Sequence, residues 1–203
     1  MINHENKFAY LGAGKTGSST ISSALRKIKG TEGAQHRTLL SVWNKPNNNI
    51  IPNNYFTFTF CRNPYSRLPS AWREFKKSGG FKWAKTEKYW NRDSFKLHGL
   101  STKNVCEDFH AFVRFATIQN HIHWCQFDFL KTFTKVDFIG KFENLQEDFD
   151  TVCDKLGIPQ QRLPHKNKSN HKHYTEYYDD ETRQIVAERY AKDIKYFGYK
   201  FGE

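Results

Sequence analysis

The chain has 203 residues, with 32 Lys and Arg against 21 Asp and Glu, which gives a formal net charge of +11. This length fits one domain with a full core, and 16% aromatic residues are too many for a disordered chain. No apolar run approaches the roughly 20 residues of a membrane-spanning helix, and the polar residues 1–7 lack the apolar segment of a signal peptide. We therefore expect one soluble, cytoplasmic domain over residues 1–203, with an anionic partner.

The first predicted elements are a strand, a glycine turn and a helix. Residues 7–11 form an apolar run that is typical of a short buried strand, and Gly12-Ala13-Gly14 follows it. Apolar residues then recur at helical spacing from Ile21 to Ile28, and Gly30 is a stop signal. The hydroxyl residues 18–20 can cap the start of this helix.

A second strand and helix follow an Asn- and Pro-rich loop at residues 44–54. Residues 55–61 are rich in aromatic and β-branched side chains, which predicts a strand. Asn63 suits an N-cap and Pro64 suits a first helical position, so we expect a helix from there to Gly79.

The later part of the chain continues the alternation. Residues 81–104 are polar and irregular, which predicts a surface excursion. The remaining elements are expected as a helix over 105–116, a strand over 136–140, a helix over 143–156 and a last helix over 179–197. Alternation of this kind predicts an α/β fold with a parallel sheet covered by helices, and ligands of such sheets bind at the carboxyl ends of the strands.

The first strand-to-helix junction carries phosphate-binding chemistry. Its glycines let the backbone approach an anion, the helix start offers free N–H groups, and Lys15 adds a full charge. The segment Gly14-Lys15-Thr16 lacks the first glycine of a nucleotide-triphosphate loop, because Ala9 stands at that position. A small nucleotide kinase is therefore an alternative that this short loop disfavours.

The second junction adds Arg62 at the strand end, with Ser66 and Ser70 about one turn apart on the following helix. Arginine grips a phosphate with two donors, and serine adds a hydroxyl donor. From Arg67 to Lys103 there are ten basic residues against three acidic ones, interleaved with aromatics. This stretch leaves a nucleic-acid-binding module as a second alternative.

Together the two junctions resemble one enzyme family. KTGSST at 15–20 with RNPxxRxxS at 62–70 is similar to the sulfotransferases that use 3′-phosphoadenosine 5′-phosphosulfate (PAPS). The closer resemblance is to the carbohydrate branch, which includes heparan sulfate 2-O- and chondroitin sulfotransferases and small bacterial members. The segment 138–145 and the tail 165–201 share it. The resemblance implies a single domain with a P-loop-like parallel sheet, PAPS as donor, 3′,5′-adenosine diphosphate (PAP) as product, and no metal.

The resemblance also implies roles for particular residues. Lys15 would stabilise the leaving phosphate, while Arg62 and Ser70 would hold the 3′-phosphate that ATP lacks. Thr16, Gly17, Ser18, Ser19 and Thr20 would line the loop around the phosphosulfate. Lys168 and Ser169 would contact the donor from a late basic loop. Many relatives have Pro before the lysine, where this chain has Gly14.

The general base and the acceptor are the remaining assignments. His36 lies between the two phosphate motifs, where related enzymes place a catalytic histidine, and Glu32 is the alternative carboxylate. The acceptor would carry a free hydroxyl, on an anionic glycan or a glycolipid headgroup, and on this interpretation nucleic acid is not a partner. We therefore expect sulfuryl transfer from PAPS to a hydroxyl of a carbohydrate.

Overall fold

The computed structural model describes residues 1–33, 51–77, 102–118, 125–131, 133, 135–164 and 172–203. The chain divides into two compact units, Met1–Arg62 with Phe129–Asn170 and Asn63–Asp128 with His171–Glu203. Within the described ranges no helix is long and apolar enough to cross a membrane. The predicted excursion at 81–104 lies outside the described residues, except for its last three positions.

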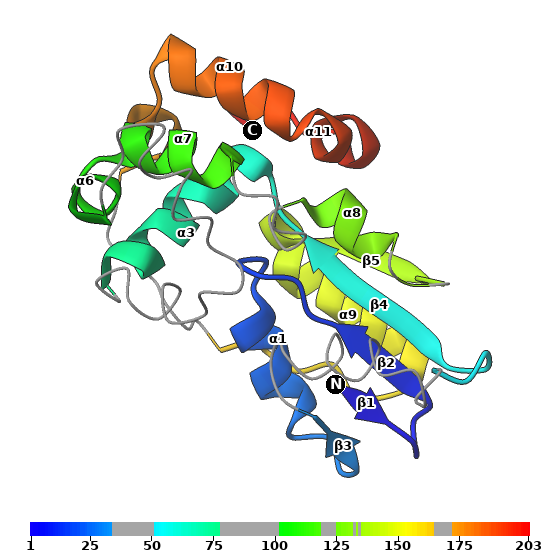
Figure 1. Cartoon of the computed structure of the whole chain (residues 1–203). Helices are drawn as coiled ribbons and strands as arrows, with labels where there is room; N and C mark the ends of the chain where they lie inside the picture. Colours follow the sequence, from blue (N-terminus) through cyan, green and yellow to red (C-terminus); the bar gives the residue numbers. More distant parts are fainter. Residues whose placement is uncertain (34–50, 78–101, 119–124, 132, 134, 165–171) are drawn as a thin grey trace. The chain divides into compact units, whose positions relative to one another are not determined.

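The described part of the first unit holds one five-stranded sheet in the order β3-β1-β2-β4-β5. Its strands are β1 (Ile2–Asn3), β2 (Phe8–Leu11), β3 (Thr31–Glu32), β4 (Phe56–Cys61) and β5 (Phe138–Lys141). The strands β2, β4 and β5 run parallel and side by side, whereas β1 is antiparallel to β2 and to β3 (Figure 1). The predicted α/β architecture is confirmed, with an antiparallel extension at one edge.

Alternating side chains explain why β2 and β4 lie at the centre of this sheet. Their aromatic residues face a core that they share with α1 (Ser18–Leu25) and α9 (Leu145–Leu156). The aromatic members are Phe8, Tyr10, Phe58 and Phe60. On the opposite face Leu11 packs with Phe129 and Phe133 in a second cluster. Since β2 is buried on both faces, it reads as a continuous apolar run, as central parallel strands do.

The second unit is helical in its described part. Its elements are α3 (Pro64–Lys77), α6 (Thr102–Glu107), α7 (Phe109–Ile118), η4 (Tyr174–Tyr177), α10 (Asp180–Arg189) and α11 (Ala191–Phe197), with α8 (Gln126–Leu130) beginning in it. Leu68 and Phe75 of α3, Phe112 of α7 and Val186 of α10 belong to one core. The predicted helix start at Asn63 and Pro64 is confirmed, because the Asn63 Oδ1 accepts from the Tyr65 N–H at 3.1 Å.

Several predicted boundaries were wrong. The helix expected over 105–116 is two helices, because Asp108 ends α6 and accepts from the N–H groups of His110 and Ala111 as the cap of α7. The helix expected over 179–197 also breaks, at Tyr190. The strand expected over 136–140 is shifted to 138–141, and a 3₁₀ turn, η3 (Phe142–Asn144), precedes α9.

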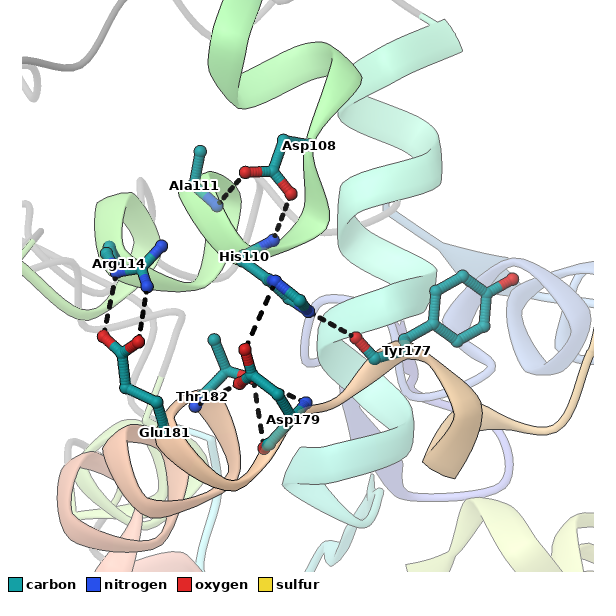
Figure 2. Close-up of polar contacts among 8 residues, drawn as sticks. All are labelled: Asp108, His110, Ala111, Arg114, Tyr177, Asp179, Glu181 and Thr182. Atoms are coloured by element: carbon teal, nitrogen blue, oxygen red, sulfur yellow. Dashed lines mark hydrogen bonds and ion pairs between the residues drawn. The ribbon is translucent and has the colours of Figure 1, made fainter.

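A polar cluster joins α7 to the start of α10 in the second unit (Figure 2). The His110 ring faces the Asp179 carboxylate through Nδ1 at 3.4 Å and the Tyr177 carbonyl through Nε2 at 3.1 Å. A neutral imidazole has one N–H, so the ring donates to both acceptors only when it is protonated. Hydrogen bonds from the Thr182 side chain and backbone, with the nearby His110 ring, lower the pKa of Asp179.

Candidate functional site

The turn between β2 and α1 has an unusual backbone. Lys15 has φ 66° and Gly17 has φ 81°, so both lie in the left-handed region. For a non-glycine residue this conformation costs about 1–2 kcal/mol. Strained residues of this kind cluster at functional sites, where the surrounding structure holds them in place. The strain therefore marks Lys15, which the sequence had already singled out by its charge.

Gly17, and not a hydroxyl residue, caps α1, so the prediction of a cap at residues 18–20 was wrong. Gly17 is the N-cap, and it has no side chain with which to bond to the first turn of the helix. A Cβ at Gly17 would lie 3.0 Å from Cδ2 of Leu145 and 3.1 Å from Cδ2 of Phe142, so both its φ and its space require glycine. The first turn therefore keeps its partial positive charge for an anion.

The hydroxyl groups of this loop point inward. Thr16 Oγ1 donates to the Ala13 carbonyl at 3.0 Å, and Ser18 Oγ donates to the same carbonyl. Thr16, Ser18 and Thr20 are buried, whereas Ser19 is half-buried. The Thr16 and Ser18 side chains thus stabilise the loop from within.

Arg62 lies against this loop. Its Nη1 donates to the Lys15 carbonyl at 3.4 Å, and its guanidinium lies 4.0 Å from the centre of the Phe142 ring. Phe142, which sequence reasoning did not assign to the site, also contacts Gly17 from η3. The sequence signal that could have placed Phe142 in the site is the segment 138–145, which shares the family resemblance. The Arg62 guanidinium therefore lies beside the backbone of Lys15, so two cationic residues are adjacent at the start of α1. Such an arrangement suits a multiply charged anion.

The second motif begins with Asn63 and runs along α3. Besides capping the helix, Asn63 donates from Nδ2 to the Lys200 carbonyl at 2.8 Å. Ser66 Oγ donates to the Asn63 carbonyl at 3.2 Å, so this serine closes the first turn. Ser70 is half-buried, and within the described part of the chain no hydrogen bond of its hydroxyl is seen. Ser70 thus differs from Ser66, whose hydroxyl closes the first turn of the helix.

Arg67 does not belong to a basic surface. It is 4% exposed, and burial lowers the pKa of its guanidinium, while Tyr190, Asp193 and Cys125 lie close enough to favour its charge. The Asp193 carboxylate is also buried and accepts from the backbone N–H groups of Gln126 and Phe127. Arg67 is therefore part of the interior of the second unit, and it drops out of the basic stretch proposed for an anionic partner.

The other predicted site residues are less defined. His36, Lys168 and Ser169 lie outside the described residues. Glu32 is exposed in β3, an edge strand that is separated from β2 by β1. Of the assigned residues of the first unit, the structure thus brings Lys15 and Arg62 together with the loop 16–20.

Comparison with known proteins agrees with this geometry. A model of the sulfotransferase family matches residues 1–200 of the chain. The chain belongs to this family. The predicted resemblance to the sulfotransferases is confirmed.

Two curated proteins are similar to this sulfotransferase-family chain. A Danio rerio protein named carbohydrate sulfotransferase 14 is 25% identical over 98% of the chain, which covers 61% of that protein. An uncharacterized protein of Archaeoglobus fulgidus is 28% identical over 53% of the chain and 72% of its own length. The chain thus spans about three fifths of the length of the zebrafish relative. No solved structure matches the chain.

Proposed function

We propose that this protein transfers a sulfuryl group from PAPS to a hydroxyl of a carbohydrate. The observation that carries the proposal is the contact of the Arg62 guanidinium with the Lys15 backbone at a helix start whose N-cap is a glycine. This constellation suits the phosphate and sulfate groups of the donor. The carbohydrate acceptor is supported by the printed name of the zebrafish relative, and the net charge of +11 favours an anionic glycan or a glycolipid headgroup.

In the proposed reaction the acceptor oxygen attacks the sulfur of PAPS while its proton passes to a general base. The bond between sulfur and the 5′-phosphate oxygen breaks, and its electron pair stays on PAP. Lys15 and the N–H groups of α1 would offset the charge that develops on this oxygen. Positioning of the donor and the acceptor would contribute to the rate as it does in phosphoryl transfer.

The remaining roles follow the family resemblance. Arg62, and Ser70 in the second unit, would bind the 3′-phosphate, with Lys168 and Ser169 as further donor contacts. His36 would be the base, with Glu32 as the alternative. A base of this kind contributes about a hundred- to ten-thousandfold in rate, so His36→Ala should reduce kcat while PAP binding stays unchanged. If Glu32→Gln abolishes turnover and His36→Ala does not, the base is Glu32.

A thermal-shift series tests the donor assignment directly. PAP at a hundred times its Kd should raise the free energy of unfolding by about 2.7 kcal/mol. This corresponds to a Tm increase of roughly 5–10 °C for a chain of this size. ATP with Mg²⁺, and 5′-AMP in a separate titration, should raise the Tm much less, because both nucleotides lack the 3′-phosphate. Arg62→Ala should remove most of the PAP effect, whereas Lys27→Ala, an exposed lysine just beyond α1, should keep it.

Turnover completes the test. Labelled PAPS should transfer its sulfuryl group to at least one member of a panel of glycans and glycolipids, independently of added metal. Equal Tm shifts with PAP and 5′-AMP would show that the 3′-phosphate is not recognised. Salt-sensitive binding of nucleic acid without any effect of PAP would instead favour the nucleic-acid-binding alternative.

A further inference from the structure

A proline interrupts α3 directly before Ser70. Pro69 is buried within the helix and has no N–H, so the carbonyl of Tyr65, four residues earlier, loses its helical donor. Tyr65 is itself 5% exposed, and a buried carbonyl without a partner destabilises the fold. The turn that carries Ser70 therefore depends on a donor from outside the helix.

Tyr178 supplies this donor. Its hydroxyl donates to the Tyr65 carbonyl at 2.9 Å from the segment between η4 and α10. Its ring packs edge-on against the rings of Tyr65, Phe109 and Phe201, with centroids 5.9, 5.0 and 5.6 Å apart. Burial raises the pKa of the Tyr178 hydroxyl well above its ordinary value, so the group remains a donor. A fixed hydroxyl thus takes the place of the missing backbone N–H.

The same part of α3 is held at its other end. The Asn63 side chain both caps the helix and donates to the Lys200 carbonyl, while Phe201 packs against Tyr65 with ring centroids 5.0 Å apart. The stretch from Asn63 to Ser70 is therefore fixed by the cap, by the ring packing and, at its weakest turn, by the Tyr178 hydroxyl. Loss of that hydroxyl leaves the Tyr65 carbonyl to be satisfied by a shift of the turn or by water.

We propose that Tyr178 is a positioning residue for the 3′-phosphate contact of Ser70. It acts through the Tyr65 carbonyl on the turn that Pro69 leaves open, and it touches no substrate atom. The inference rests on the proposed function, since it assumes that Ser70 binds the 3′-phosphate. It predicts a defect that depends on the 3′-phosphate of the ligand, which a general loss of stability would not produce.

The test is the affinity of Tyr178→Phe for PAP and for 5′-AMP, measured by calorimetry on the full chain. The substitution keeps the ring packing and removes only the hydroxyl. We expect PAP to bind roughly three- to tenfold more weakly, the usual effect of one lost hydrogen bond, and 5′-AMP to bind as in the wild type. Tyr177→Phe is the matched control, because among the described residues no hydrogen bond of its hydroxyl is seen and its affinities should not change.

The same substitution in a Pro69→Ala protein provides a second test if Tyr178→Phe alone is poorly stable. Pro69→Ala restores a backbone N–H for the Tyr65 carbonyl, so Tyr178→Phe should weaken PAP binding much less in the Pro69→Ala protein. Equal losses for PAP and 5′-AMP, or no loss for either, would overturn the inference. If the wild type itself does not distinguish PAP from 5′-AMP, the proposed function fails and this inference falls with it.

Discussion

Replacing Lys15 by alanine and by glycine separates its charge from its backbone conformation. Both variants remove the ammonium group that would stabilise the leaving phosphate, so both should reduce turnover by roughly a hundredfold or more. Their stabilities should differ, because Lys15 has φ 66°. Alanine at this position retains a left-handed cost of about 1–2 kcal/mol, which glycine avoids.

The expected magnitude follows from two opposing effects. Glycine escapes the left-handed cost but loses about 0.5–1 kcal/mol more conformational entropy on folding than alanine does. Lys15→Gly should therefore have a free energy of unfolding about 0.5–1 kcal/mol higher than that of Lys15→Ala. At Lys155, an exposed lysine of α9 with ordinary helical φ, alanine should instead be more stable than glycine by about the same amount.

Urea denaturation of the four variants measures both differences, and a PAPS turnover assay of the Lys15 pair measures the role of the charge. The sign of the Ala-to-Gly difference should invert between positions 15 and 155. If alanine is the more stable residue at both positions, the strained conformation of Lys15 does not exist in solution. Near wild-type turnover in either Lys15 variant would refute its assignment to the leaving phosphate.

Three further outcomes follow from the local geometry. Gly17→Ala should lower the free energy of unfolding by about 2–3 kcal/mol through left-handed strain and crowding. Gly14→Ala, whose Cβ would have no atom of the described residues within 4 Å, should change it by no more than about 0.5 kcal/mol in urea denaturation. Gly140→Ala should lower the free energy of unfolding by about 1–3 kcal/mol, because the new Cβ would lie 2.5 Å from Cε1 of Phe60. The pKa of Asp179 is lowered below its ordinary 3.8, so its carboxylate stabilises the fold above that pH, and the stabilisation is lost as the pH falls through the lowered value. Asp179→Asn should therefore lower the Tm at about pH 6, and the difference from the wild type should shrink towards about pH 3.

The strands and helix starts that the sequence predicted correctly are those with strong local signals. The run at 55–61 alternates aromatic and β-branched residues on a buried strand, and Asn63-Pro64 is a cap and a first helical residue in adjacent positions. The strands β1 and β3 were missed because two residues each carry no periodicity. The break at Tyr190 was missed because the apolar stripe continues across it.

Within the site, the sequence predicted which charged residues follow the strands, but it did not predict what surrounds each side chain. Lys15 and Arg62 follow strands that the pattern predicts, so their proximity follows from parallel pairing of β2 with β4. The burial of Arg67 could not be predicted, because Asp193 and Tyr190 lie far along the chain. The left-handed φ of Gly17 was likewise invisible beside three candidate hydroxyl caps.

The order of the two units along the chain bears on how the protein is made. Neither unit is one continuous stretch, since Asn63–Asp128 is inserted between β4 and β5 and the tail from His171 returns to the second unit. On the ribosome β4 emerges long before its parallel partner β5, and an unpaired strand edge is a template for aggregation. The nascent chain therefore cannot complete one unit before starting the other, and a stop codon or cleavage before β5 leaves a sheet without its edge strand.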